Sequence, residues 1–412
     1  MAGVAFALRK LVQRDDLFSN AAGYFLAGFV STGPWLFTVV ALLAVEQLAG
    51  RSDADVETTV FRGILVYNFA FSLVFTAPLV MITTRYVADC VYIQAHEPVP
   101  GALLMSLSVV LVSSTVMAGA YYGWVVELPT EMRIAAVINY CLIASMWVVS
   151  VFLSVLRGYI LYAATFCIGI SAAAFAAIQL GYTYGSVGLL IGMNLGLAGT
   201  LFALLGWTLA SFPFRFAYPP AFMRYMYRFG DLALYGLLGA LALWVDKWVM
   251  WFAPEAAEVV RGMVFFYEYD NAMFLVYLTI VPGLAYIFLS VETGLEEHIR
   301  TYLGAVNGEA TWTQLEKTRV ALGRFIADRL RTLILVQGTL SIVVAGMGPQ
   351  ILAALGASYT QVGIFRIGVL AAFFHVLILF LAAVFTYLDL RRVNVTLQGL
   401  LVVLSAFGTA LS

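Results

Sequence analysis

Residues 61–84, FRGILVYNFAFSLVFTAPLVMITT, decide the class of this fold. Apart from Arg62 the stretch is uncharged, and about 20 apolar residues are enough to cross a bilayer as a helix. Inside lipid every backbone donor and acceptor must be satisfied within the protein, so this segment must be helical. Pro78 removes one backbone hydrogen bond and bends the helix. Comparable apolar spans contain Pro34, Pro282 and Pro349, and such bends favour a cavity or a moving part.

Apolar runs of this kind fill the chain almost from end to end. Of its 412 residues, 63% are hydrophobic and 11% are charged, and the mean hydropathy is +0.95. These values are far from those of a soluble globular protein, so we predict an all-α polytopic membrane protein. The sequence predicts eleven spans near residues 21–46, 61–84, 101–125, 132–156, 158–180, 187–211, 230–252, 271–291, 332–355, 364–387 and 393–412.

The charges between the spans predict an orientation. With a cytoplasmic N-terminus, most Lys and Arg residues lie on the inside, and the outer segments hold only Arg51, Arg62, Arg133 and Arg261. A cationic substrate would be drawn to an acidic outer face, although acidic outer loops also follow simply from keeping the cations inside. The acidic residues at or near that face are Asp53, Asp55, Glu57, Glu127, Glu131, Glu255, Glu258, Glu268 and Asp270.

The order of spans and linkers predicts two bundles. We expect a cytoplasmic amphipathic helix at 1–20, a six-helix bundle at 21–211, a basic cytoplasmic linker at 212–229 and a second bundle at 230–412. The second bundle includes a hydrophilic segment, 292–331, whose Leu315, Leu322, Ile326 and Leu330 recur at helical spacing. This segment could lie on the membrane, dock a cytoplasmic partner, or be a solvated connector with one apolar face against the bundle.

Ionisable residues within the spans are the first candidates for function, because they are costly in lipid and usually face a protein interior or a water-filled path. Asp246 and Lys247 lie in the seventh span. Successive helical residues diverge by roughly 100°, so we expect that they do not form one side-by-side salt bridge. The tryptophans at 244, 248 and 251 share a face, which could stack sugar rings or form an interfacial aromatic belt.

Polar residues in other spans extend the predicted substrate path. Tyr67 and Asn68 lie in the second span, where Asn68 needs a hydrogen-bond partner that could be only the next helix. The acidic and aromatic entrance to the eighth span suits carbohydrate, although Asp270 would equally complement a helix N-terminus. The path residues of that span are Glu268, Asp270 and Asn271.

His375, in the tenth span, is a candidate for proton coupling, or a neutral imidazole bonded to another helix.

Motifs for other chemistries are not found. Cys90, Cys141 and Cys167 have no CxxC spacing, so neither a disulfide framework nor a zinc site is predicted. The sequence has no GxxxxGK[ST] phosphate loop and no convincing pairing of a nucleophile with a base. We therefore expect no enzyme activity, no catalytic residue, no cofactor, no metal and no nucleic-acid partner.

Several segments together resemble one family. They are MAGVAFALRKL at 1–11, AGFVSTGPW at 27–35, VYNFAFSL at 66–73, TRYVAD at 84–89, YDNAMF at 269–274, IVP at 280–282, VET at 291–293 and TYLDLRR at 386–392. Spread from the first span to the region before the last, they are similar to the PelG family of inner-membrane exporters of the Pel exopolysaccharide.

This resemblance implies a fold, a function and partners. PelG-like proteins belong to the MOP flippase superfamily, with two six-helix bundles around a central cavity lined by the first, second, seventh and eighth helices. They export a cationic, amino-sugar-rich polymer for biofilm matrix, together with a cytoplasmic glycosyltransferase and a cyclic-di-GMP receptor subunit. The superfamily has twelve crossings, so either two spans are merged in our count of eleven or the last helix is absent.

We therefore predict transport of a Pel-like polysaccharide to the periplasm, with bends at Pro34, Pro78 and Pro282 shaping the lumen. Two alternatives remain open. One is an ion-coupled exporter of drugs or other small molecules with the same fold, and the other is a membrane scaffold for a glycosyltransferase.

Overall fold

The computed structural model describes residues 55–411 except 157–158, 213–218, 291–293 and 309. The predicted helix at 1–20, the first span and Pro34 lie outside these residues. In the described part, nine helices are long and apolar enough to cross a membrane. The all-α, polytopic prediction is confirmed, and the predicted spans from the second onward all fall on helices.

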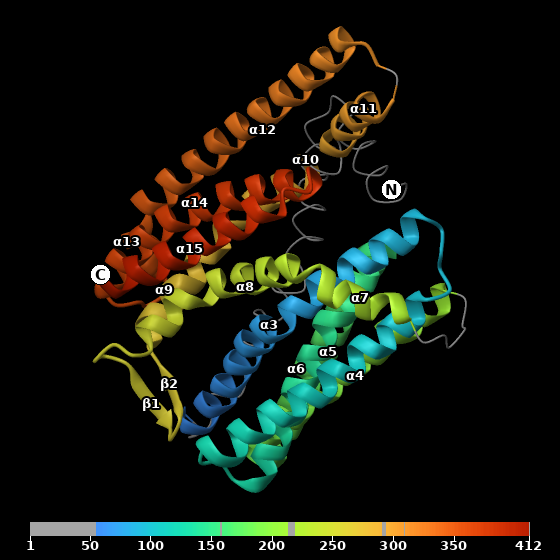
Figure 1. The fold of residues 1–412 in the computed structure, drawn as a ribbon. Coiled ribbons are helices and arrows are strands. Elements are labelled where there is room, and N and C mark those ends of the chain that lie inside the picture. The colour runs from blue at the N-terminus through green and yellow to red at the C-terminus, as the bar shows by residue number, and fades with distance from the viewer. Residues whose placement is uncertain (1–54, 157–158, 213–218, 291–293, 309, 412) are drawn as a thin grey trace. The chain divides into compact units, whose positions relative to one another are not determined.

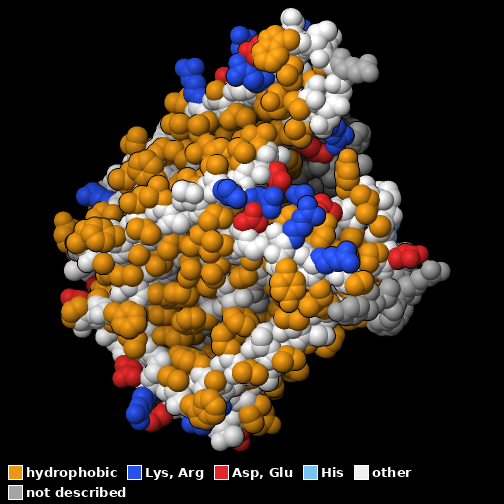
Figure 2. Space-filling view, in the orientation of Figure 1, with side chains coloured by type: hydrophobic (Ala, Val, Ile, Leu, Met, Phe, Trp, Pro, Cys, Tyr) orange, Lys and Arg blue, Asp and Glu red, His pale blue; other side chains and the backbone are white. Residues whose placement is uncertain are grey.

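The chain divides by its internal contacts into two compact units. The N-terminal unit contains the described residues up to Phe265, and the C-terminal unit runs from Phe266 to Leu401. Figure 2 shows that hydrophobic side chains cover most of the visible surface of both units, with the charged ones gathered in a few places. A surface of this composition is typical of a protein solvated by lipid.

The N-terminal unit is built around α3 (Asp55–Tyr92), which packs against α4 (Val99–Ala120), α5 (Thr130–Leu156) and α8 (Gly230–Met250) (Figure 1). Pro78 lies inside α3, as predicted. A short π-helix, η1 (Tyr121–Val125), extends α4, and α7 (Pro220–Arg228) packs on α3. α6 (Tyr159–Ser211) carries the fifth and sixth predicted spans, and its helical geometry breaks at Gly185, where φ is 60° and ψ is −143°.

A β-hairpin that the sequence did not predict follows α8. β1 (Ala257–Val260) pairs antiparallel with β2 (Met263–Phe265). The hydroxyl of Tyr67 donates to the carbonyl oxygen of Val264 and accepts from its N–H, both at 2.9 Å. At the turn, Tyr121 Oη donates to Gly262 O at 2.7 Å. The hairpin is therefore held on α3 and η1.

The C-terminal unit contains α9 (Tyr267–Leu278) and α10 (Val281–Ser290), which together match the eighth predicted span. α11 (Glu296–Asn307), α12 (Trp312–Gly346) and α13 (Gly348–Ala354) follow, then α14 (Thr360–Tyr387) and the start of α15 (Arg391–Leu411). α14 packs against α9 and α12, and α12 also contacts α10 and α11.

In this unit one segment is longer than its predicted bounds, and the predicted bend at Pro349 was wrong. The segment 292–331 is not separate from the ninth span, because α12 runs unbroken from Trp312 into it. Thr311 begins that helix with a capping box, in which its side chain accepts from the N–H of Gln314. Pro349 does not bend a continuous helix either. It lies in the first turn of α13, after α12 has ended, where a proline removes no helical hydrogen bond.

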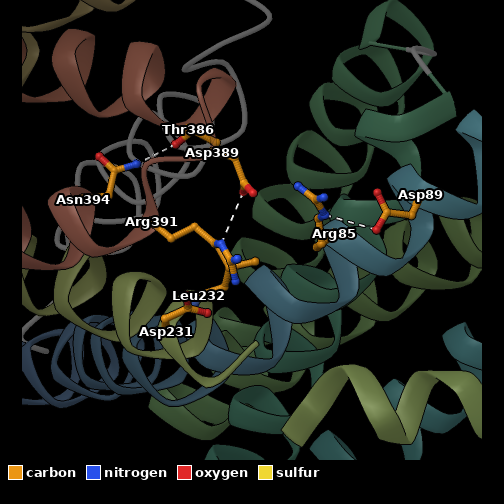
Figure 3. Close-up of polar contacts among 8 residues, drawn as sticks. All are labelled: Arg85, Asp89, Asp231, Leu232, Thr386, Asp389, Arg391 and Asn394. Atoms are coloured by element: carbon orange, nitrogen blue, oxygen red, sulfur yellow. Dashed lines mark hydrogen bonds and ion pairs between the residues drawn. The ribbon is translucent and has the colours of Figure 1, made fainter. Parts of the chain in front are cut away.

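Charged side chains near helix ends pair locally within each unit (Figure 3). Arg85 Nε donates to Asp89 Oδ2 at 3.1 Å. The hydroxyl of Tyr225 donates to the same oxygen at 2.9 Å, which fastens α7 to α3. Burial and this hydrogen bond raise the pKa of Tyr225, so the phenol stays a donor. In the C-terminal unit, Arg391 pairs with Asp389 at 3.3 Å and Asn394 donates to Thr386 at 2.9 Å.

The hairpin turn gives a testable prediction. Gly262 has φ +88°, and a Cβ there would lie 2.7 Å from Val125 O, whereas Gly356, with φ +71°, has open space around it. Gly262→Ala therefore combines backbone strain of about 1–2 kcal/mol with a steric clash, and Gly356→Ala has the strain alone. We expect a lower unfolding temperature in detergent for the Gly262 variant than for the Gly356 variant. Equal temperatures would mean that the hairpin does not need this close approach.

Candidate functional site

A chain of buried amides crosses the N-terminal unit. Asn68 Nδ2 donates to Asn139 Oδ1 at 2.9 Å, and Asn139 Nδ2 donates to Asn194 Oδ1 at 2.8 Å. Tyr122 Oη donates to Asn68 Oδ1 at 2.7 Å. The three asparagines are at most 8% exposed and come from α3, α5 and α6. We call this connected set the asparagine chain.

The asparagine chain also ends on backbone groups. Asn68 Nδ2 donates to Ala136 O at 3.0 Å, and Asn194 Nδ2 donates to Ala135 O at 2.9 Å. Each amide in the chain therefore donates and accepts, as buried polar groups must. The side chain of Asn68 is hydrogen-bonded to α5 and η1. This residue was predicted to line the substrate path or to bond to another helix, and the structure shows the second of these contacts. As it stands, the chain fixes α3, α5 and α6 against one another.

Tyr67, the neighbour of Asn68, is also buried. Its ring stacks on Trp251 with centroids 4.7 Å apart and contacts Phe265 edge-on at 5.1 Å. One turn further along α3, Phe71 stacks on Trp248 at 4.8 Å. Trp248 of α8 and Trp251, which directly follows α8, thus pack on α3, and Trp251 is only 7% exposed.

Asp246 and Lys247 form a salt bridge, so the prediction that they would not pair was wrong. Lys247 Nζ lies 3.2 Å from Oδ1 and 3.1 Å from Oδ2 of Asp246, and it also donates to Leu243 O at 3.1 Å. The Cα–Cβ bonds of the two residues point in different directions, but the long, flexible lysine side chain curves around the helix and reaches the carboxylate. The two residues are 4% and 8% exposed. The result is a desolvated, locally neutral ion pair within an apolar helix.

In the C-terminal unit the acidic entrance to α9 is tied to the loop before α14. Glu268 is exposed, and its Oε2 accepts from Thr360 Oγ1 at 2.9 Å. Its other oxygen, Oε1, accepts from Ser358 Oγ at 3.4 Å. Asp270 lies with Glu268 in the first turn of α9, where negative charge complements the helix dipole, and Asn271 follows it, half-buried.

A break in the eighth span follows. α9 ends at Leu278 and α10 begins at Val281, with Pro282 in its first turn, where its missing N–H cannot continue the α9 ladder. Gln337 of α12, which is fully buried, donates from Nε2 to Thr279 O at 3.0 Å. The bend predicted at Pro282 is therefore a discontinuity between two helices, and a side-chain amide from a neighbouring helix satisfies the backbone there.

His375 lies on α14 and is 7% exposed. Its ring contacts Tyr277 of α9 edge-on, with centroids 6.4 Å apart. The imidazole therefore lies against the last turn of α9, close to the helix break in the same unit. Its predicted role in proton coupling stays a prediction.

The sequence analysis missed Asn139, Asn194 and Gln337. The available signal was the same for each, namely a single amide within an otherwise apolar run. Such residues in a span seek partners across helices, and the three do so here. Among the described residues no group of three His, Cys, Asp or Glu side chains that could hold a metal ion is found.

The amide of Gln337 gives a second prediction. Gln337→Met removes the donor and leaves the half-buried carbonyl of Thr279 without this hydrogen bond, which costs up to roughly 1–3 kcal/mol. Ser341→Ala is the matched control, because Ser341 lies one turn along α12, is also buried, and its hydroxyl has no hydrogen-bond partner among the described residues. We expect thermal unfolding in detergent to be lowered clearly by Q337M and little by S341A. A Q337M protein as stable as the S341A protein would contradict this account of the helix break.

Solved structures with the same fold are transporters. A MOP superfamily transporter from Pyrococcus furiosus matches 98% of this chain and 88% of its own, with 14% identity and a TM-score of 0.56. A point mutant of the Vibrio cholerae MATE transporter VcmN matches 96% of this chain and 86% of its own, with 13% identity and a TM-score of 0.61. These likenesses show a MOP superfamily fold.

The search of curated proteins gave no match. A family model does match, over residues 1–412, with the description "PelG: Putative exopolysaccharide Exporter (EPS-E)". The match includes all of the segments on which the resemblance was first based. The chain therefore belongs to the PelG family of exopolysaccharide exporters.

Proposed function

We propose that this protein moves a cationic, amino-sugar-rich exopolysaccharide from the cytoplasm to the periplasm across the bacterial inner membrane, with its N-terminus in the cytoplasm. The observation that carries the proposal is the match of the exporter family to the whole chain, on a multi-pass transporter fold. The bias of Lys and Arg toward one set of loops supports the orientation. A cytoplasmic glycosyltransferase and a cyclic-di-GMP receptor subunit are the proposed partners.

The buried ion pair on α8 supports a cationic cargo. A desolvated carboxylate needs a cation beside it, and Lys247 supplies one in the structure. The ammonium group of an amino sugar has the same charge and the same hydrogen-bonding capacity as the lysine side chain. In the proposed function it therefore exchanges with Lys247 at Asp246 without leaving the carboxylate unpaired. Glu268 supplies a further, exposed carboxylate in the other unit.

Charge removal tests this proposal. Asp246→Asn alone would leave Lys247 buried without its counter-ion, at a cost of roughly 3–5 kcal/mol, so the informative variant is D246N/K247Q. We expect D246N/K247Q to reduce secreted polymer severalfold and E268Q to reduce it less, with unchanged amounts of the protein in the membrane. Secreted polymer is measured against the level of the exporter by immunoblot.

The control for this test is Glu97→Gln, an exposed residue in the loop between α3 and α4 that lies outside the predicted path. It should leave secretion unchanged. Wild-type secretion by D246N/K247Q and by E268Q would remove these residues from the path, and the family membership would still stand.

Ion-coupled export of small molecules is the second candidate, and the buried His375 is the observation that favours it. In that case His375→Gln would abolish proton-driven dye accumulation in inverted vesicles. If the protein exports only exopolysaccharide, neither the wild type nor the His375→Gln variant accumulates dye. Dye accumulation by the wild-type protein alone therefore distinguishes the two functions.

A further inference from the structure

Three cations form a line along the first half of α12. Lys317, Arg324 and Arg331 are seven residues apart, and because two helical turns take about 7.2 residues they drift by only about 20° per step. All three side chains are exposed, and none forms an ion pair within the described part of the chain. We call them the basic stripe.

Other arginines of this region contact neighbouring side chains, and two of them form ion pairs. Arg319 pairs with Glu316 at 2.6 Å and Arg300 pairs with Glu296 at 2.5 Å. Arg329 lies over the ring of Phe325 at 5.0 Å. Asp328, close to the basic stripe in sequence, takes part in no ion pair with another residue that the structure describes. Asp328 lies on the same face of α12, so the three cations of the stripe and this one carboxylate leave a net charge of +2 on this surface.

An apolar line runs beside the basic stripe. Val320, Ala327 and Ile334 each follow a stripe residue by three positions, and Val320 and Ile334 are 36% and 41% exposed. In coiled coils, an apolar line with seven-residue spacing packs against the apolar line of a second helix, and charges beside it pair with opposite charges on that helix. The cations beside this apolar line therefore match a second helix that has acidic residues beside its own apolar line. The apolar line gives contact area, and the charges select the partner.

The stripe is supported from behind. On the other side of α12, Leu322 is buried and Phe325 stacks on His298 of α11 with centroids 4.3 Å apart. These residues point roughly 140° and 100° away from the stripe around the helix, as the helical repeat requires. The α11 contact therefore leaves the basic face uncovered while holding the helix that carries it.

The length of the stripe argues against lipid as its occupant. From Lys317 to Arg331 the helix rises about 21 Å, whereas one headgroup layer is roughly 5–8 Å thick. Headgroups can therefore reach only the end of the stripe that is closer to the span, at Arg331. A protein helix lying along α12 can reach all three cations at once.

We propose that the basic stripe and its apolar border on α12 bind an acidic amphipathic helix of a cytoplasmic protein. The proposal rests on the proposed function for its orientation, since α12 then begins in the cytoplasm. It adds the docking surface through which the exporter meets the machinery that supplies its polymer.

The test uses the full-length protein in nanodiscs of neutral phosphatidylcholine. The probe is a fluorescent synthetic helix of four heptads with leucines along one line and glutamates on both sides of it, and fluorescence anisotropy measures binding. We expect binding that weakens with salt and that falls at least tenfold in K317Q/R324Q/R331Q. The control variant R300Q/R319Q, which removes paired arginines nearby, should bind like wild type.

A charge swap keeps the test independent of folding. K317E/R324E/R331E should lose the acidic probe and bind a probe with lysines in place of its glutamates. Equal binding of the acidic probe to wild type and to the glutamine variant, or no binding to wild type, would overturn the proposal. Loss of co-purifying phosphatidylglycerol in the glutamine variant, without probe binding by wild type, would overturn it in favour of lipid. None of these binding measurements depends on secretion. The secreted-polymer assay tests the proposed function separately, so failure of either proposal can be recognised without the other.

Discussion

Every backbone group inside the bilayer needs a hydrogen-bond partner, and this constraint shapes both units. Continuous helices satisfy it by themselves, which is why the described chain is almost entirely helical. Where the helix stops, something else must supply the partner. At the break between α9 and α10 the amide of Gln337 does so for Thr279. In the hairpin, which lies between two candidate spans, the hydroxyl of Tyr67 likewise serves both backbone groups of Val264.

The same constraint explains which polar side chains the spans contain. The asparagine chain joins three helices through amides, and amides do not titrate at any physiological pH. Its hydrogen bonds therefore persist whatever the proton gradient across the membrane. The groups in the described spans that can change or exchange charge include the Asp246–Lys247 pair in one unit and His375 in the other. The amides that join helices and the residues proposed to act in transport are thus of different types.

Hydropathy predicted most of the fold because a span must be long and apolar to exist at all. The predicted gap between the fifth and sixth spans, residues 181–186, contains Gly185, where the backbone does leave helical geometry. The hairpin was missed because its turn, Arg261–Gly262, lacks the common two-residue turn sequences and its strands are only four and three residues long. The continuity of α12 was missed because charge was read as the end of the helix, although a helix can continue beyond the membrane.

The candidate site was less predictable than the fold, since composition marks polar residues but not their partners. Asn68 was found as a polar residue in lipid, yet its links to Asn139 and Asn194 depend on how α3, α5 and α6 pack. The Asp246–Lys247 pair was misjudged because Cβ directions were used for a side chain with four rotatable carbons. Backbone geometry predicts which residues can contact each other when their side chains are short, but not when they are long and flexible.

The Asp246–Lys247 pair bears most directly on function because stability alone does not explain it. Replacing a buried ion pair by apolar residues of similar volume is often neutral or stabilising by about 1–4 kcal/mol, so packing would be served as well by two leucines. We therefore relate this pair, whose charges lie 3.1 Å apart, to the proposed function rather than to packing alone. In the proposed function that requirement is exchange: Asp246 releases Lys247 only when another cation takes its place, and a cationic polymer would bring one with every amino sugar.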